Sequence, residues 1–179
     1  DCGVRGAGAG VWGWACVGRK ASAGRLSAGF WNGAAGSVTV GGVDVRETDA
    51  QALMRQVAFV FQETRLFEQS ILANIRAARP EASREQVMEA ALAAQCGDIL
   101  EKLPEGLDTV IGTKGVYLSG GECQRIALAR AILKDAPIIV LDEASAFADP
   151  ENEYQIQKAF ETLVRGKTVL IIAHRLSTV

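Results

Sequence analysis

Four polar side chains that could bind a metal ion or activate water each follow a short apolar stretch of the chain: Gln62, Asp142, Glu143 and His174. A carboxylate at the position of Asp142, after four aliphatic residues, is suited to hold Mg²⁺ against phosphate oxygens. Glu143 could polarise an attacking water as a general base, and His174 could contact a γ-phosphate. The amide of Gln62 could reach both the metal ion and the water. These residue types together predict phosphoryl-transfer chemistry on a nucleoside triphosphate.

A parallel sheet would bring these four side chains to one place. Apolar strands are expected at residues 57–61, 138–141 and 168–173, and each ends directly before one of the polar groups. Ligands of open α/β sheets bind beyond the carboxyl ends of the strands. A single histidine or Asp-Glu pair after a strand is more often a surface or capping group. Three such coincidences favour a common site at one edge of the sheet.

The other segments show helix and hairpin patterns. Helices are expected at residues 71–78, 84–94, 119–133 and from Pro150 onward. Ser83 and Gln86 make a capping box for the second of these helices. Residues 37–45 alternate around a Gly-Gly pair and predict an antiparallel hairpin, whereas residues 102–116 are expected to form a loop. Helices that alternate with continuous apolar strands predict an α/β fold in which helices flank a parallel sheet.

The helix expected at residues 119–133 opens with Ser119-Gly120-Gly121-Glu122. Ser119 and Glu122 match a capping box, which accounts for these two residues. It does not account for two adjacent glycines, each of which weakens a helix by about 1 kcal/mol relative to alanine. Bare backbone at a helix N-terminus offers free N–H groups at the positive end of the helix dipole. We therefore predict that this turn binds a phosphate group.

The run from Leu118 to Arg125 resembles the signature motif of the ATP-binding cassette (ABC) ATPases. In the family's order and at similar spacing, Gln62 matches the Q-loop and His174 matches the switch histidine. Residues 138–143 resemble the Walker B strand with its catalytic glutamate, and residues 145–149 resemble the D-loop. The resemblance implies a P-loop NTPase-like parallel sheet, a helical signature subdomain and an antiparallel β piece near the N-terminus.

Within the family, residues 60–67 and 172–179 resemble exporter-type domains, in which the ATPase follows a membrane domain in one polypeptide. Residues 147–153 resemble a subgroup that includes siderophore-related transporters. Exporters usually carry Gly-Glu before the signature motif, and this chain has Gly112-Thr113-Lys114-Gly115 there. The family's chain also continues past the switch histidine, so we expect the C-terminal end to be truncated.

The opening of the chain differs from the rest in composition. Of 19 glycines, 12 lie in residues 1–42, all three tryptophans lie in residues 1–31, and one acidic residue, Asp1, precedes Asp44. Ordinary globular domains do not change composition so sharply. We therefore separate residues 1–36 from an ABC ATPase domain that follows, residues 37–179, with its helical subdomain at about 68–135 by resemblance.

The opening region also lacks a regular Walker A loop, G-x-x-x-x-G-K-[ST], whose amides cradle the phosphates of a nucleotide. Lys20 lies about where the family places its lysine, and Ser22 matches the residue after the metal-binding position. Other residues replace the expected glycines and the expected Ser/Thr: Trp14, Val17, Arg19 and Ala21. Side chains at the glycine positions obstruct the approach of phosphate oxygens to the backbone, so this half-site is expected to bind ATP poorly.

Two explanations of the opening region compete. It is a natural degenerate cassette that pairs with a competent partner, or residues 1–36 are translated partly in the wrong frame. The register of Lys20 and of Phe30-Trp31 argues for the first explanation, and the composition break favours the second. Translating all three frames of the coding DNA through this region separates them, because a frame error predicts a hidden Gly-Lys-Ser/Thr loop.

The resemblance implies that ATP and Mg²⁺ are the cofactors and that two such domains pair head to tail around ATP. The second ABC ATPase domain can be a copy of this chain or a different one. Transmembrane permease domains would be the other partners, which places the domain at the cytoplasmic face of the cell membrane. The expected function is ATP hydrolysis that powers an ABC exporter, with Glu143, His174 and Gln62 in catalysis. Asp142 and Gln62 would hold the metal ion, and Lys20, Ser22 and residues 119–122 would bind ATP.

A rival interpretation is a non-catalytic half that completes a partner's ATP site through Ser119–Glu122. A DNA-repair ABC protein would carry coiled-coil or zinc insertions, and the residues between Gln62 and Ser119 show neither heptads nor C-x-x-C. The net charge of -2 argues against a nucleic-acid partner. No apolar run approaches the ~18 residues of a membrane span, and four scattered cysteines are interpreted as reduced thiols.

Overall fold

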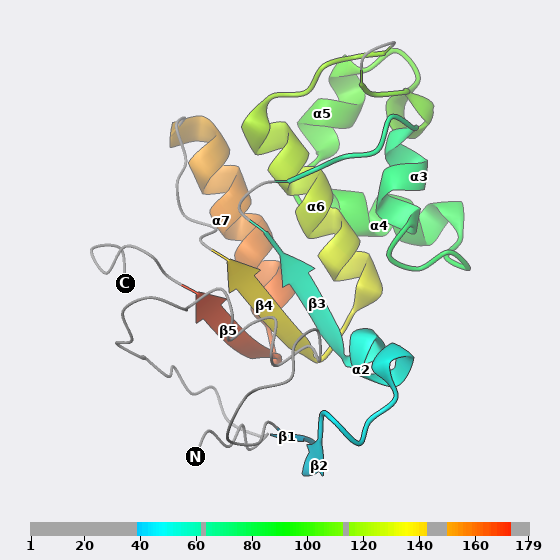
Figure 1. Ribbon diagram of the computed structural model, residues 1–179. Coiled ribbons are helices and arrows are strands. Elements are labelled where there is room, and N and C mark those ends of the chain that lie inside the picture. Colours follow the sequence, from blue (N-terminus) through cyan, green and yellow to red (C-terminus); the bar gives the residue numbers. More distant parts are fainter. Residues whose placement is uncertain (1–38, 62–63, 113–114, 143–149, 173–179) are drawn as a thin grey trace. The chain divides into compact units, whose positions relative to one another are not determined.

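The computed structural model describes residues 39–61, 64–112, 115–142 and 150–172 of the 179-residue chain (Figure 1). These residues belong to two compact units. One unit contains all the strands and the short helix α2 (Ala50–Gln56), and the other contains the remaining helices. Among the described residues, no helix combines the length and the apolar character that crossing a membrane requires.

The first unit is built on a parallel sheet of three strands in the order β3-β4-β5. These strands are β3 (Val57–Val60), β4 (Ile138–Asp142) and β5 (Thr168–Ile172). Val60 pairs with Leu141, and Asp142 pairs with Ile172, so all three carboxyl ends lie at the same edge. The expected parallel sheet is confirmed, with each strand within one residue of its predicted bounds.

A two-stranded antiparallel sheet joins β1 (Thr39–Val40) to β2 (Val43–Asp44) and confirms the predicted hairpin. Gly41 and Gly42 turn the chain with φ angles of 61° and 86°, which glycine adopts without steric cost. Helix α2 follows, and the Asp49 carboxylate caps it by accepting from the amide of Ala52 at 2.9 Å. The hydrophobic core of this unit contains four buried residues that pack together: Val45, Leu53, Val57 and Val140.

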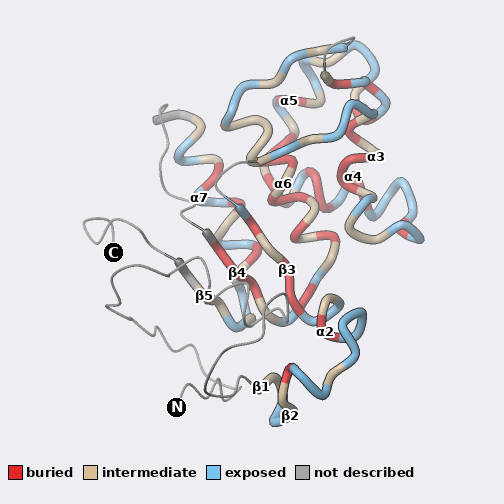
Figure 2. Tube along the Cα trace, in the orientation of Figure 1, coloured by how far each residue is buried: buried red, intermediate tan, exposed pale blue. Residues whose placement is uncertain are grey.

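The second unit contains five α-helices and one 3₁₀ helix in its described part: α3 (Ile71–Arg76), α4 (Arg84–Ala93), α5 (Gly97–Lys102), η1 (Gly106–Asp108), α6 (Gly120–Lys134) and α7 (Pro150–Val164). Helix α6 packs against α3, α4 and α7. Its residues Ile126, Leu128 and Ala129 are fully buried, and the buried stripes of the helices can be followed in Figure 2. The long α6 therefore forms the centre of this unit.

Most of these helices agree with the predicted ones, and the capping box of Ser83 and Gln86 at the start of α4 is confirmed. Three short helices were not predicted: α2, α5 and η1. The 3₁₀ helix lies inside the segment expected to be a loop. Elements of three to seven residues show less than two helical turns of periodicity, so tertiary contacts decide them.

Candidate functional site

The strand ends that should carry the site are at one edge of the sheet, as the sequence predicts. Asp142 is the last residue of β4, opposite Ile172 at the end of β5. Five of the predicted site residues lie outside the described residues: Lys20, Ser22, Gln62, Glu143 and His174. The arrangement of these side chains around Asp142 therefore stays a prediction.

The predicted phosphate-binding turn, residues 119–122, is described in full at the start of α6. The Ser119 hydroxyl accepts from the Glu122 amide at 3.2 Å, and the Glu122 carboxylate accepts from the Ser119 amide at 2.8 Å. The expected capping box is thus confirmed. It satisfies the first and last amides of the turn and leaves the two between them for other partners.

Those two amides belong to Gly120 and Gly121. The described part of the chain offers neither of them a hydrogen-bond partner. Gly120 also faces open space, because a Cβ atom placed there would meet nothing within 4 Å. Packing therefore gives no reason for a glycine at position 120. Free amides beside an unobstructed backbone, at the positive end of a 15-residue helix, fit a phosphate group.

Gly121 also has an explanation in packing, which the sequence does not reveal. A Cβ atom at position 121 would lie 2.8 Å from Cγ and 2.9 Å from Cβ of Asn152 on α7. Real Cβ atoms do not approach other atoms so closely. Close packing of α6 against α7 therefore requires glycine at this position, whether or not a phosphate binds.

Behind this turn, Arg125 is buried with its side chain only 2% exposed. Its guanidinium donates to both carboxylate oxygens of Asp98, at 2.6 and 3.1 Å, and to the backbone oxygen of Gln95 at 2.6 Å. It also donates to Oδ1 of Asn152 at 3.2 Å. One side chain thus connects α6 to α5, to the residues before α5 and to α7.

The Asp98 carboxylate is the charge that compensates Arg125. Burial by itself would raise the pKa of Asp98, but the hydrogen bonds and the charge of Arg125 outweigh it and lower that pKa. The carboxylate is 46% exposed, so it keeps contact with water while it holds the buried guanidinium. Asp98 therefore stays ionised at neutral pH and keeps Arg125 paired.

A second arginine of α6, Arg130, holds the segment that precedes α3. It donates to the backbone oxygens of Arg65 at 3.0 Å and of Asn74 at 2.7 Å, and its guanidinium lies 5.4 Å from the centre of the Phe67 ring. The Asn74 side chain is completely buried and bonds both the amide and the carbonyl of Phe67. These contacts fix the segment that follows Gln62 in the sequence.

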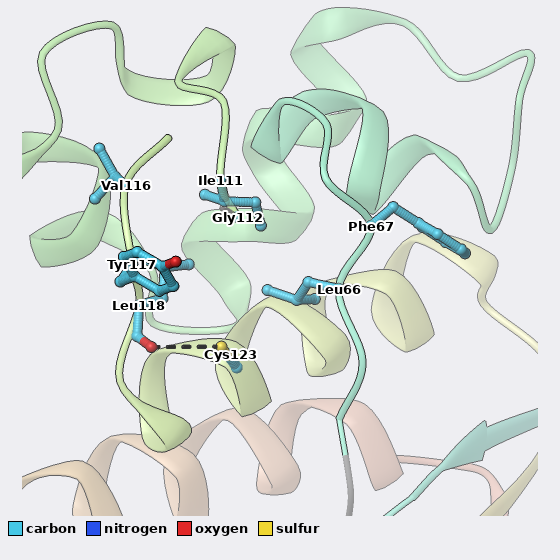
Figure 3. Close-up of a pocket in the computed structure, with 8 residues that line it drawn as sticks. All are labelled: Leu66, Phe67, Ile111, Gly112, Val116, Tyr117, Leu118 and Cys123. Atoms are coloured by element: carbon cyan, nitrogen blue, oxygen red, sulfur yellow. Dashed lines mark hydrogen bonds between the residues drawn. The ribbon is translucent and has the colours of Figure 1, made fainter. Parts of the chain in front are cut away.

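That segment forms one wall of a pocket of about 190 Å³ in the helical unit (Figure 3). Apolar residues make up most of its lining: Leu66, Phe67, Ile111, Val116, Tyr117 and Leu118, with Gly112 and Cys123. The residues Phe67 and Tyr117 are 57% and 75% exposed. These two aromatic residues add exposed apolar surface beside the pocket, and such surface is typical of sites that contact other proteins.

Comparison with known proteins identifies the class of protein to which this fold and the predicted phosphate-binding turn belong. The family model for the ABC transporter matches residues 20–146. The chain therefore belongs to the ABC transporter family, and this family implies the P-loop NTPase fold, of which the described sheet and helices show a part.

Two relatives show the kind of protein in which this domain occurs. The chain is 48% identical over 160 residues to the "Mycobactin import ATP-binding/permease protein IrtA" of Mycolicibacterium smegmatis, which covers 89% of this chain and 18% of the relative. It is 46% identical over 150 residues to the "ATP-dependent lipid A-core flippase" of Legionella pneumophila, covering 84% of this chain and 26% of the relative. The chain thus spans about a fifth to a quarter of the length of these relatives.

Sequence reasoning missed the residues that support the site: Asn74, Asp98, Arg130 and Asn152. Each is an ordinary polar residue in a helix, and its partners lie on other elements. Only Arg125 had been included, as the last residue of the signature motif, without a role. An arginine or asparagine on the apolar face of a predicted helix is the one signal that points to such a buried polar contact.

Proposed function

We propose that the chain is the ATP-binding and hydrolysing domain of an ABC exporter, and that the first turn of α6 binds phosphate oxygens of ATP held by a second such domain. The observation that carries this proposal is the pair of free amides at Gly120 and Gly121. The capping box of Ser119 and Glu122 holds the turn in the helical geometry that points these amides outward. Membership of the ABC transporter family indicates that the nucleotide is ATP.

The remaining roles follow the chemistry of the predicted residues. Asp142 would hold Mg²⁺, which neutralises charge on the phosphate oxygens when it is bound. Glu143 would take a proton from the attacking water, while Gln62 and His174 would orient the water and contact the γ-phosphate. Lys20 would contact the phosphates of this chain's own nucleotide, with Ser22 beside it.

Transmembrane domains are the second proposed partner. The names of the two relatives include a permease and a flippase, and this chain spans a small part of each. A segment of such a membrane domain would fit the apolar pocket between Leu66 and Tyr117. Because Arg130 holds one wall of the pocket and belongs to α6, movement at the pocket would be transmitted to the helix that begins at Ser119.

One alternative is favoured by a specific observation, the replacement of the Walker A glycines by Trp14, Val17 and Arg19. In this alternative the chain does not hydrolyse ATP and lends Ser119–Glu122 to the site of a competent partner. Both functions use the same turn of α6. They differ in whether this chain turns over ATP by itself.

The test measures MgATP hydrolysis by the chain alone and in an equimolar mixture with the ATPase domain of the Legionella pneumophila flippase. Turnover by the chain alone that Glu143→Gln abolishes supports the proposed function. Turnover only in the mixture, above that of the flippase domain, supports the alternative. Absence of both activities contradicts both functions.

The role of the turn is tested with Ser119→Asp, because aspartate caps a helix as well as serine but places a negative charge against the phosphate. The matched control is Ser83→Asp at the other capping box, which is remote from the proposed site in sequence and begins α4. We expect Ser119→Asp to lose the activity measured above and Ser83→Asp to keep it. Equal effects of the two substitutions would contradict a phosphate site at α6.

A further inference from the structure

We infer that Asn152 is a positioning residue for the phosphate-binding turn of α6, acting on it through Gly121 and Arg125. The inference rests on the proposed function for the meaning of that turn, and on packing and hydrogen bonds for the mechanism. All the residues involved belong to the helical unit.

The first contact is steric. Asn152 occupies the space that a side chain at position 121 would need, since a Cβ atom there would lie 2.8 to 3.1 Å from three atoms of Asn152. A Cβ atom added at Gly120, one residue earlier, would have no neighbour within 4 Å. The turn therefore rests on α7 at Gly121 and stays open at Gly120. Asn152 sets how deeply this turn can approach α7.

The second contact is polar and fixes the orientation of the asparagine. Oδ1 of Asn152 accepts from Arg125 at 3.2 Å, and the same guanidinium is held by the Asp98 carboxylate and the Gln95 carbonyl. Arg125 is buried, so its guanidinium cannot turn to water without losing these partners. Asn152 is consequently held between two residues of α6 that lie four positions apart, one turn of the helix.

This arrangement links the first turn of α7 to the first turn of α6. Helix α7 begins at Pro150, so Asn152 is its third residue. A displacement of α7 reaches Asn152 in its first turn, and from there the amides of Gly120 and Gly121. Asn152 would thus relate the position of the phosphate-binding turn to the position of α7.

The test is a double-substitution cycle with Gly121→Ala and Asn152→Gly. The control is Gln157→Gly, an exposed position on the same helix, where the change to glycine costs at least as much helix propensity as Asn152→Gly. The first readout is hydrogen exchange of the Glu122 and Cys123 amides, which bond the Oγ and the backbone oxygen of Ser119. It is measured on the chain alone and needs no nucleotide. Circular dichroism establishes that each variant is folded.

We expect Gly121→Ala to speed exchange of these two amides about tenfold, because the added methyl group pushes the turn away from α7. Asn152→Gly in the same chain should restore exchange to within about threefold of the unsubstituted chain, whereas Gln157→Gly should restore nothing. Additive effects of Gly121→Ala and Asn152→Gly would overturn the inference.

The second readout is the MgATP concentration that gives half-maximal turnover in the activity assay described above. We expect about a tenfold rise for Gly121→Ala, about a threefold rise for Asn152→Gly, and a double variant near the weaker of the two effects, with the maximal rate little changed. A merely structural contact would change the unfolding midpoint and leave this concentration unchanged. Absence of turnover in the unsubstituted chain would contradict the proposed function. The exchange measurement would still test whether Asn152 positions the first turn of α6.

Discussion

The guanidinium of Arg130 donates to both oxygens of Asn74, to its backbone oxygen at 2.7 Å and to its side-chain Oδ1. The same Oδ1 accepts from the Phe67 amide at 2.8 Å. Burial lowers the pKa of Arg130, but a guanidinium begins so far above neutral pH that it keeps its charge. A charged donor and a completely buried asparagine thus form the joint between α6, α3 and the segment that lines the pocket.

The first prediction concerns this joint. Arg130→Met should lower the free energy of unfolding by about 3 kcal/mol, because it removes the charged donor from the backbone oxygen of the buried Asn74 and also breaks the bonds to Asn74 Oδ1 and to the exposed Arg65 carbonyl. Urea-induced unfolding followed by circular dichroism measures the change. The control is Arg79→Met, whose partner Glu81 is 73% exposed, and it should cost less than about 1 kcal/mol. Equal losses for the two substitutions would show that Arg130 does not hold the segment.

The second prediction is a pH dependence that comes from Asp98. Its pKa is lowered in the folded chain, so its contribution to stability is complete above the ordinary carboxylate pKa of about 3.9 and is lost as the pH falls through the folded value. Asp98→Asn should therefore cost about 2 kcal/mol at pH 7, less than a fully buried pair because the carboxylate is 46% exposed. The cost should shrink as the pH is lowered below 4.

Urea unfolding of the two proteins between pH 7 and pH 3 measures this difference. Glu81→Gln is the control, since Glu81 forms an exposed ion pair with Arg79. It should give a nearly constant, small difference across the same range. A difference for Asp98→Asn that does not depend on pH would mean that the charge of Asp98 does not stabilise Arg125.

The third prediction concerns the sharp turn before the signature motif. A Cβ atom at Gly115 would lie 2.2 Å from the backbone oxygen of Val110, and a backbone atom cannot move aside as a side chain can. Gly115→Ala should cost about 3 kcal/mol of unfolding free energy. Gly97→Ala, where the nearest atom is 3.7 Å away, should cost nothing or stabilise α5 by up to about 1 kcal/mol. Thermal unfolding compares them, and similar midpoints would contradict the close approach.

The elements that the sequence predicted are those whose pattern is complete within one segment. The strand Ile138–Asp142 has an uninterrupted apolar run, and α6 combines a capping box with a helical period over 15 residues. The site residues were predicted for the same reason, because strand ends and helix starts can be recognised locally. The family resemblance drew on those same residues.

The contacts that could not be predicted from the sequence are those between residues in distant segments of the chain. Arg130 bonds a carbonyl 65 positions away and Arg125 bonds a carboxylate 27 positions away, and no local pattern selects these partners. The two glycines of the signature motif look identical in sequence. One of them faces open space and the other faces Asn152, a difference that exists only once α6 and α7 are packed.

That difference supplies the fourth prediction, Gly120→Ala. The position has no neighbour within 4 Å of an added Cβ atom, and alanine is favoured over glycine in a helix by about 1 kcal/mol, so stability should be unchanged or raised. The methyl group nevertheless stands beside the two free amides and hinders a phosphate there. The half-maximal MgATP concentration should rise about tenfold or more while the unfolding midpoint does not fall. Gly97→Ala, at the start of α5, controls for the gain in helix propensity and should leave that concentration unchanged. A Gly120→Ala variant that is stable and retains the original MgATP dependence would mean that the amides of this turn do not bind ATP.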